Sequence, residues 1–244
     1  MTRPGQCVIL VGGLGSRLGD LVADLPKPML EVAGRPFLLH LMEEAARYGF
    51  TRFLLLAGYR AEVVCDYFAS GSGRWPGNWQ VEVLAEPEPL GTGGALRAAA
   101  GYLEEKFLLT NGDSICRFEW SQMARPFKHP QTQGRLALRP MPERGRYGRV
   151  EVDGDKIAAF IPSSNDEGPA LINAGVYFLR KEVIKLIPPG PFSLEAGLWP
   201  ELARQGLLEY YPAAEAYFID IGLPEDLRRA SRELPALSRA GELQ

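Results

Sequence analysis

A glycine-rich turn directly after a buried strand is the feature that most constrains this chain. The apolar run Cys7 to Val11 predicts a first strand, and Gly12-Gly13-Leu14-Gly15-Ser16-Arg17-Leu18 follows it at once. Such glycines let the backbone approach a ligand closely, and consecutive N–H groups in the turn form an anion site. Arg17 adds a fork of donors suited to phosphate. The pattern predicts a phosphate-binding turn, with a plain tight turn as the alternative.

A second basic residue follows in a stiff setting. Lys27 lies between Pro26 and Pro28, and the two prolines are expected to hold the local backbone extended and stiff. The ammonium group is then presented at a fixed place, where it can meet a second phosphate. The common phosphate-binding loops do not match, because GxxxxGK[ST] is absent and Leu18 replaces the third glycine of GxGxxG. The alternative is that Arg17 and Lys27 are exposed side chains.

Composition excludes several classes of protein. The chain has 244 residues, of which 46% are hydrophobic and 23% charged, which is typical of a globular α/β domain. A net charge of -3 and the absence of a basic run argue against a nucleic-acid partner. The 3 cysteines, Cys7, Cys65 and Cys116, lack metal-site spacing and are expected to be reduced packing residues. No stretch reads as a signal or membrane span, so we expect a cytoplasmic protein without a membrane partner.

Strands and helices alternate through the first half. Apolar runs predict strands at 53–57, 81–84 and 107–110, and helical spacing predicts helices over 36–48, 61–68 and 94–103. This alternation predicts a mainly parallel sheet covered on both faces. Ligands of such sheets bind beyond the carboxyl ends of the strands. The glycine turn, Glu86 to Thr92 and Asn111-Gly112-Asp113 should therefore converge on one edge. His40, on the first helix, is expected to be satisfied or solvated rather than a ligand.

The second half is less regular. Strands are predicted over 135–139, 149–152, 157–161 and 172–179, and helices over 194–206 and 224–234. Residues 235–244 are polar and are expected to form a frayed tail. No repeat or linker is visible, so residues 1–234 are expected to form one domain.

Two aspartates follow apolar runs and precede or follow glycine. Asp113 ends the fourth predicted strand, and Asp220 lies within Phe218-Ile219-Asp220-Ile221-Gly222. Mg²⁺ takes one or two carboxylates together with phosphate oxygens, whereas a buried unpaired carboxylate is costly. The pair therefore indicates a Mg²⁺ site. The alternative for each is a turn or helix cap, and Asp220 could cap the helix that begins near Pro224.

These motifs resemble those of the sugar-1-phosphate nucleotidylyltransferases. The segment from Pro26 to Leu38 is similar to short bacterial enzymes of the D-glycero-D-manno-heptose 1-phosphate guanylyltransferase type. The family motifs occur in order as GGLGSRL, PKP, LGTGGAL, NGD, NAGVY, SLE and FIDIG. The resemblance implies a Rossmann-like three-layer α/β/α nucleotidyltransferase fold with a mixed, mainly parallel central sheet. It also implies transfer of a nucleotidyl group from a nucleoside triphosphate to a sugar 1-phosphate, with release of pyrophosphate.

The resemblance also implies a role for particular residues. It divides the domain into a nucleotide-binding half, 1–113, and an acceptor-sugar half, 114–234. The implied catalytic residues are Arg17, Lys27, Asp113 and Asp220, with Asp113 and Asp220 as the Mg²⁺ ligands. The implied nucleotide-binding residues are Gly12, Gly13, Leu14, Gly15, Ser16, Arg17, Lys27, Glu86, Gly91, Thr92, Gly112 and Asp113. The implied sugar-binding residues are Tyr147, Gly148, Asn173 and Glu195.

The sequence departs from the family pattern at two places. Many relatives carry Glu-Lys-Pro after the strand that ends near Phe160, and its lysine meets the acceptor phosphate, but here Ile161-Pro162-Ser163-Ser164 follows. Many relatives also place a lysine after Ser-Leu-Glu, where Ala196 stands here. The candidate replacements for these lysines are Arg146, Arg149 and Arg180.

Glu86 bears on the choice of nucleotide. A carboxylate only accepts hydrogen bonds, which suits the two adjacent donors of guanine, N1–H and the N2 amine, better than the edge of uracil, thymine or adenine. This favours GTP as donor, unless Glu86 is a solvated loop acid. The family resemblance implies a manno-heptose 1-phosphate as acceptor. Mannose 1-phosphate, or a UTP or CTP donor, remains an alternative. A non-catalytic nucleotide-sugar-sensing paralogue and a dinucleotide-dependent oxidoreductase are the other interpretations. A homo-oligomer is compatible with all of them.

Overall fold

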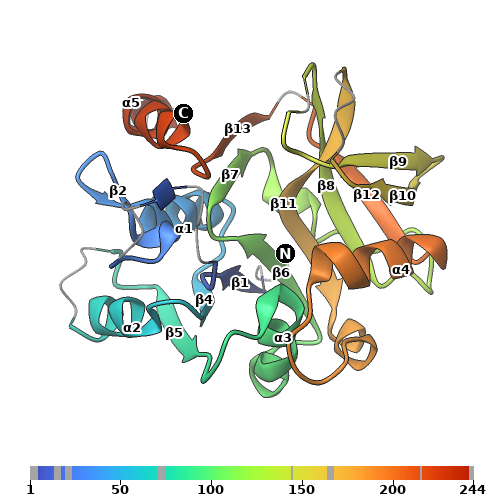
Figure 1. The fold of residues 1–244 in the computed structure, drawn as a ribbon, viewed down its shortest axis with the longest axis horizontal. Coiled ribbons are helices and arrows are strands. Elements are labelled where there is room, and N and C mark those ends of the chain that lie inside the picture. The colour runs from blue at the N-terminus through green and yellow to red at the C-terminus, as the bar shows by residue number, and fades with distance from the viewer. Residues whose placement is uncertain are drawn as a thin grey trace.

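A nine-stranded sheet runs through the molecule in the order β5-β4-β1-β6-β11-β8-β12-β10-β9 (Figure 1). The computed structural model describes residues 5–13, 18–19, 24–70, 75–143, 145–163, 168–214 and 216–241. In sheet order the strands are β5 (Gln80–Ala85), β4 (Arg52–Ala57), β1 (Gln6–Leu10), β6 (Lys106–Asn111), β11 (Ala170–Arg180), β8 (Gly134–Met141), β12 (Leu208–Pro212), β10 (Lys156–Ile161) and β9 (Arg149–Asp153).

The sheet is mixed, and its first half is parallel. Strands β5, β4, β1 and β6 all run in one direction, while β11 is antiparallel to both of its neighbours, β6 and β8. Strand β12 is parallel to β8, and β10 is antiparallel to β12 and β9. The carboxyl ends of β5, β4, β1 and β6 therefore meet at one edge, as the strand–helix alternation predicted.

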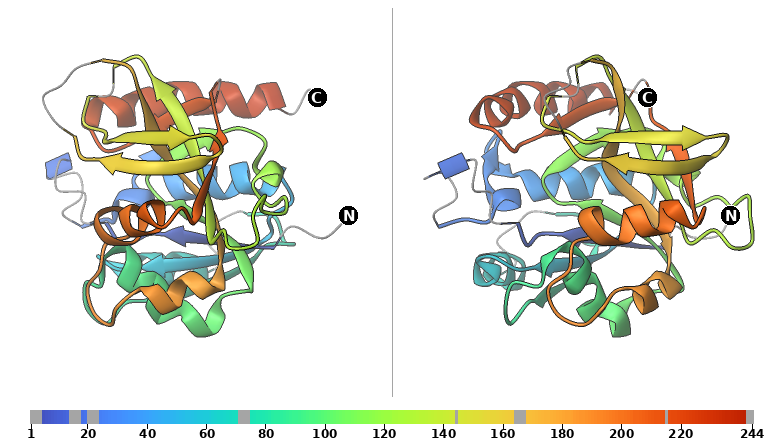
Figure 2. Two further views of the ribbon diagram at one scale, coloured as in Figure 1. Left: turned by 90° about the vertical axis from the view of Figure 1, so that its right-hand side faces the viewer. Right: turned by 45° about the vertical axis from the view of Figure 1, so that its right-hand side comes forward.

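Helices cover both faces of this sheet. Along β1, Cys7 and Ile9 belong to one buried cluster and Val8 and Leu10 to the other, because successive strand residues point to opposite faces. The first cluster packs against α1 (Phe37–Arg47), α2 (Ala61–Ala69) and α5 (Pro224–Gly241), and the second against α3 (Gly91–Ala98) and α4 (Trp199–Arg204). Figure 2 shows α5 and α3 at opposite ends of the molecule, with the strands between them. The predicted α/β/α arrangement is confirmed.

Two small sheets and several short turns complete the fold. Strand β2 (Glu31–Val32) pairs with β3 (Arg35–Pro36), and β7 (Ser114–Arg117) pairs with β13 (Tyr217–Asp220). The short helical turns are η2 (Lys27–Met29), η3 (Ala99–Tyr102), η4 (Trp120–Gln122), η5 (Lys181–Leu186) and the π-helical η6 (Leu194–Leu198). The β7–β13 pair brings the two halves of the sequence together, because it sets Asp220 opposite Ser114.

Several boundaries differ from those predicted. Helix α3 begins at Gly91 rather than at 94, because the Phe192 carbonyl accepts from the N–H groups of Gly93 (2.8 Å) and Gly94 (3.2 Å) at the helix start. The predicted helix over 194–206 begins as the π-helical turn η6. Strand β12, which pairs in parallel with β8 in the sheet, was not predicted.

The C-terminal helix is longer than expected. Helix α5 continues through Pro235 to Gly241, where the sequence predicted an end at 234. The side chain of Leu237 packs against the first buried cluster, and Arg117 donates to the Leu237 carbonyl at 3.0 Å. These contacts stabilise the last turns beyond the proline. None of the helices in the described ranges has the length and apolar character that crossing a membrane requires.

The cysteines and His40 behave as predicted. Cys7 and Cys116 are buried and all three cysteines, including Cys65, are free thiols. His40 is buried, and its Nε2 lies 2.8 Å from the Val32 carbonyl oxygen, so its polar atoms are satisfied within the core. We therefore assign these residues to packing rather than to chemistry.

A buried ion pair organises the loop before β8. Arg135 and Glu209 are 6% and 1% exposed, and the guanidinium donates to the carboxylate at 2.7 Å. Arg135 also donates to the carbonyls of Met123, Arg125 and Pro126, and Glu209 accepts from Lys128, His129 and Thr132. The pair thus satisfies the backbone of a connection that has little regular structure.

We predict that Glu209→Ala lowers the free energy of unfolding by about 3–5 kcal/mol, because it leaves the buried Arg135 charge without its partner. Chemical denaturation measures the loss. Glu201→Ala, which removes an exposed partner of Arg204, serves as the control and should leave the denaturation midpoint close to that of the wild type. An equal effect of both variants would contradict the prediction.

Candidate active site

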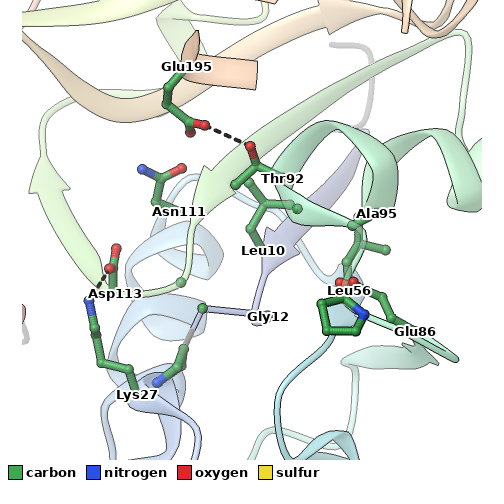
Figure 3. Close-up of a pocket in the computed structure, with 15 residues that line it drawn as sticks. Leu10, Gly12, Lys27, Leu56, Glu86, Thr92, Ala95, Asn111, Asp113 and Glu195 are labelled. Atoms are coloured by element: carbon green, nitrogen blue, oxygen red, sulfur yellow. Dashed lines mark hydrogen bonds and ion pairs between the residues drawn. The ribbon is translucent and has the colours of Figure 1, made fainter. Parts of the chain in front are cut away.

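Two adjoining cavities lie at the carboxyl edge of the sheet. The first, of about 420 Å³, is formed by the segments that follow β1, β5 and β6. It is lined by Leu10, Gly12, Gly13, Lys27, Pro28, Leu56, Glu86, Pro89, Gly91, Thr92, Ala95, Asn111, Gly112, Asp113 and Glu195 (Figure 3). The second, of about 650 Å³, lies between β11, the β9–β10 pair and β13. Asn111, Asp113 and Glu195 line both cavities.

Charged side chains stand on two sides of the first cavity. Lys27 and Asp113 stand on one side and Glu86 on the other, with Gly12 between them (Figure 3). The Lys27 Nζ lies 2.7 Å from Asp113 Oδ2. The ammonium group is thus fixed beside a carboxylate that follows the end of β6, in a cavity wall where a phosphate group can contact a cation.

The backbone around Gly12 must be bare for Glu86 to lie where it does. A Cβ on Gly12 would stand 3.0 Å from Glu86 Oε1, and one on Gly58 would stand 3.0 Å from the same oxygen. Gly112 is restricted more strongly, because its Cβ would collide with the backbone carbonyl oxygen of Leu10, which cannot move aside as the end of a side chain can. The glycines therefore bring the ends of β1, β4 and β6 close together around the cavity.

Glu86 is half-buried and points into the first cavity. Its Oε2 accepts from the Leu90 N–H at 2.9 Å. Burial raises the pKa of Glu86, while the hydrogen bond from Leu90 opposes that rise. Glu86 is therefore not the solvated loop acid that the sequence left as an alternative.

The second cavity has a network around Asp220. The Tyr147 hydroxyl donates to Asp220 Oδ2 at 3.1 Å, and an Arg146 NH2 lies 3.3 Å from the same oxygen. Asp220 Oδ1 accepts from the Gly222 N–H at 2.7 Å. Asp220 therefore closes a turn with one oxygen and presents the other to the second cavity.

Asp113 and Asp220 are neighbours across the β7–β13 pair. The Ile221 N–H donates to the Asp113 carbonyl at 3.0 Å. Burial, followed by the charge of Asp113, raises the pKa of the Asp220 carboxyl, while Arg146 and Lys27 oppose the rise. Two like charges are thus held together in a partly desolvated place, with one cation beside each.

This arrangement fits a divalent cation that is shared with a phosphate ligand. Within the described ranges, no group of three or more His, Cys, Asp or Glu side chains is placed to bind a metal ion by itself. Mg²⁺, however, is commonly held by one or two carboxylates together with the phosphates of a substrate. The two adjacent aspartates supply that donor set.

A bulge in β11 forms the floor of the second cavity. The pairing of β11 with β8 shifts between Asn173 and Tyr177, and Gly175 has a φ of +76°. The Asn173 side chain donates to the Tyr177 hydroxyl at 3.0 Å and accepts from the Gly175 N–H at 3.0 Å. The bulge therefore holds the Asn173 amide at the cavity surface instead of in a ladder.

Glu195 forms the wall between the cavities. Its Oε2 accepts from the Thr92 hydroxyl at 2.7 Å and from the Ser193 hydroxyl at 3.0 Å. Thr92 in turn accepts from the Leu194 N–H at 2.9 Å. Helix α3 and the turn η6 are thereby tied together at the point where the cavities meet (Figure 3).

The structure brings the described site residues of the sequence analysis together. Those that line the first cavity are Gly12, Gly13, Lys27, Glu86, Gly91, Thr92, Gly112 and Asp113, and those that line the second are Tyr147, Gly148, Asn173, Glu195 and Asp220. Leu14, Gly15, Ser16 and Arg17 lie outside the described residues. The sequence analysis did not single out Asn111, although it belongs to the Asn-Gly-Asp motif, or the contact of Tyr147 with Asp220.

One local prediction was wrong. Lys27 does not lie in an extended segment but begins the turn η2, in which Leu30 N–H bonds the Lys27 carbonyl at 3.1 Å. Only Pro26 is extended, and Pro28 fits the first turn because its missing N–H would have no partner there.

The three candidate arginines separate into two groups. Arg146 and Arg149 line the second cavity together with Ser163 and Ala196. Arg180 lies elsewhere, where it donates to the Thr132 carbonyl and stacks over Phe127. Arg180 is therefore excluded as a replacement for a missing lysine.

Comparison with known proteins agrees with this geometry. The family model described as "Nucleotidyl transferase" matches residues 6–236. The chain belongs to the nucleotidyl transferase family. Membership separates it from the dinucleotide-dependent oxidoreductases that the glycine turn alone left open.

Its relatives include guanylyltransferases. The chain is 35% identical, over 94% of its length and 98% of the relative's, to a D-glycero-alpha-D-manno-heptose 1-phosphate guanylyltransferase of Aneurinibacillus thermoaerophilus. It is 34% identical to a mannose-1-phosphate guanylyltransferase of Mycobacterium tuberculosis over 96% of the chain, but spans only 65% of that protein.

A solved structure shares the fold closely. HddC from Yersinia pseudotuberculosis superimposes with a TM-score of 0.81 and 33% sequence identity, covering 93% of this chain and 98% of that one. A second structure of HddC, described as complexed with GMP-PN, gives the same values. The nucleotidyltransferase fold expected from the sequence is confirmed.

We predict that Asp220→Asn lowers catalytic activity and, without added metal, leaves the melting temperature at pH 7 no lower than that of the wild type. The raised pKa means that ionised Asp220 costs folding free energy above that pKa. The cost disappears as the group becomes protonated in both folded and unfolded states. Thermal denaturation from pH 7 downward should therefore show the wild type gaining stability relative to the variant. A lower melting temperature of the variant at pH 7 would contradict this account.

Proposed function

We propose that this protein transfers GMP from GTP to a sugar 1-phosphate of the manno series, releasing pyrophosphate. The observation that supports this most directly is the meeting of Lys27, Asp113 and Asp220 where the two cavities join. A phosphate-bearing ligand in each cavity would have its reacting end at that point. Family membership and the guanylyltransferase relatives support the reaction class.

The proposed reaction needs positioning and charge neutralisation rather than a protein nucleophile. An oxygen of the acceptor phosphate attacks the α-phosphorus, and the bond from that phosphorus to the oxygen of the leaving pyrophosphate breaks. The attacking oxygen is already ionised, so no general base is required. A divalent cation, proposed to be Mg²⁺, would be held by Asp113 and Asp220 and would neutralise charge on the α-phosphate.

Lys27 is proposed to bind the α-phosphate from the first cavity. Its ammonium group is held 2.7 Å from Asp113 and is largely shielded from solvent. A charge-assisted contact in such a place is stronger than one in water. Arg17, outside the described residues, is proposed to bind the leaving pyrophosphate with the turn amides.

Tyr147, Gly148, Asn173 and Glu195 are proposed to bind the acceptor sugar. All four line the second cavity, and hydroxyl, amide and carboxylate groups are suitable partners for sugar hydroxyls. The heptose 1-phosphate is the favoured acceptor, because the relative with that activity matches the chain over nearly its whole length. Mannose 1-phosphate is the second candidate, supported by the relatives that carry that name.

A panel assay tests the proposed function. Pyrophosphate release is measured with GTP, ATP, UTP, CTP and dTTP, each combined with heptose, mannose and glucose 1-phosphates in the presence of Mg²⁺. The highest kcat/KM is expected for GTP with a manno-configured acceptor. Asp113→Asn is the matched variant and should lower turnover by ~10²–10³, because it removes one charge-stabilising contact. Absence of pyrophosphate release with every pair would favour the sensing paralogue and reject the proposal.

We predict that Glu86→Gln erodes the preference for GTP over UTP. The glutamine carbonyl can keep the hydrogen bond from Leu90, so that the amide nitrogen replaces the oxygen that accepts from guanine. The ratio of kcat/KM for GTP to that for UTP should fall by about 5- to 150-fold, the value of one bidentate base contact. Glu88→Gln, at an exposed position two residues away, is the control and should keep the ratio. An unchanged ratio in Glu86→Gln would reject Glu86 as the base-reading residue.

The raised pKa of Glu86 adds a test by pH. As pH falls, Glu86 takes up a proton at a higher pH than an ordinary glutamate, because burial raises its pKa. The GTP preference of the wild type should decline through that range. Glu86→Gln has no group to titrate there, so its ratio should stay level.

A further inference from the structure

The second cavity carries more negative than positive side chains. Its lining includes the carboxylates of Asp113, Asp220 and Glu195, whereas its lining cations in the described part of the chain are Arg146 and Arg149. A sugar 1-phosphate brings further negative charge into this cavity. A cation of the protein that is not already paired with these carboxylates is the side chain best suited to bind that phosphate.

Arg146 is already committed to other groups. Its NH2 lies 3.3 Å from Asp220 and 3.1 Å from Asp226 of helix α5, and its guanidinium stacks over the Tyr147 ring at 5.0 Å. These contacts hold Asp220 and Tyr147 in place. Arg146 is therefore a positioning residue, whose charge is balanced within the protein.

Arg149 is held much more loosely. It begins β9, and its guanidinium donates to Glu151 at 2.8 Å, the one side-chain partner it has in the described ranges. Both side chains are solvent-exposed, at 43% and 48%, and such pairs contribute little to stability. The Arg149 Nε is buried without a hydrogen-bond partner in the described ranges, as is the Arg146 Nε, so this atom does not distinguish the two arginines. What distinguishes Arg149 is its partly exposed guanidinium, whose pairing with Glu151 can be given up to a ligand at small cost.

The position of Arg149 also suits an acceptor phosphate. Its backbone pairs with Ile161 at the end of β10, and Ile161, Pro162 and Ser163 line the same cavity. This loop contributes no cation of its own, and Ala196 across the cavity contributes none. A fork of donors on the neighbouring strand can bind two phosphate oxygens at once, which a lysine cannot do.

We propose that Arg149 binds the phosphate of the sugar 1-phosphate. This inference rests on the proposed function and adds a residue to it. The contact belongs to the acceptor and not to the nucleotide, because Arg149 lines the second cavity and not the first. The phosphate is common to every acceptor, so Arg149 supports affinity without choosing among sugars.

Steady-state kinetics of Arg149→Ala test this assignment. The KM for the acceptor should rise about 10- to 100-fold, as expected for loss of one charge-assisted contact, while the KM for GTP stays within about twofold of the wild type. The rise should be the same with D-mannose 1-phosphate and with the manno-heptose 1-phosphate. Arg149→Lys keeps the charge without the fork and should fall between the wild type and Arg149→Ala.

Arg204→Ala is the matched control. Arg204 pairs with an exposed glutamate three residues away and lines neither cavity, so both KM values should be unchanged. An acceptor KM for Arg149→Ala equal to that of the wild type would overturn the inference. A rise confined to one sugar, or an equal rise for GTP, would also overturn it. Thermal denaturation shows whether Arg149→Ala is folded. If it is not, the KM values of Arg149→Lys are compared with those of the wild type in its place, and an unchanged acceptor KM overturns the inference. A wild type inactive with all acceptors would instead reject the proposed function.

Discussion

The pairing of β7 with β13 is the constraint on which the site depends. Each strand has only four residues, yet their register sets Asp220 opposite Ser114 and joins Ile221 to Asp113 by a backbone hydrogen bond. Two acids more than 100 positions apart in the sequence, Asp113 and Asp220, thereby become neighbours. The same pairing ties β13, and helix α5 after it, to the end of β6. The ladder contributes Ser114 and Asp220 to the second cavity, directly beside Asp113, which lines both cavities.

Placing two carboxylates together is unfavourable, and the fold offsets it with two cations from different segments. Lys27 lies against Asp113 and Arg146 against Asp220. Like charges at close range disfavour ionisation, whereas opposite charges restore it. The raised pKa of Asp220 indicates that the compensation is incomplete. Ionised Asp220 is therefore favoured by an added positive charge, which suits the divalent cation proposed at this place.

The sequence predicted what depends on local pattern. The strands β1, β4 and β6 are continuous apolar runs that supply residues to both buried clusters, and these runs predicted the sheet. The residues that follow the runs predicted the lining of the first cavity. Features that depend on contacts between segments far apart in the sequence could not be predicted from the local pattern. The contact of Tyr147 with Asp220 needs the register of β13, and the extension of α5 past Pro235 needs Arg117 and packing of Leu237. Strand β12 is short, and its pairing in parallel with β8 is a contact between segments far apart in the sequence.

Glu195 contributes to the walls of both cavities and bonds Thr92 at the start of α3. Under the proposed function, a change at this shared wall affects the sites of both substrates at once. A substitution at Glu195 that reshapes the acceptor side also removes the partner of Thr92 and alters the nucleotide side. New sugar preferences in this lineage are therefore expected to arise through residues such as Asn173 and Gly148, which border the second cavity alone.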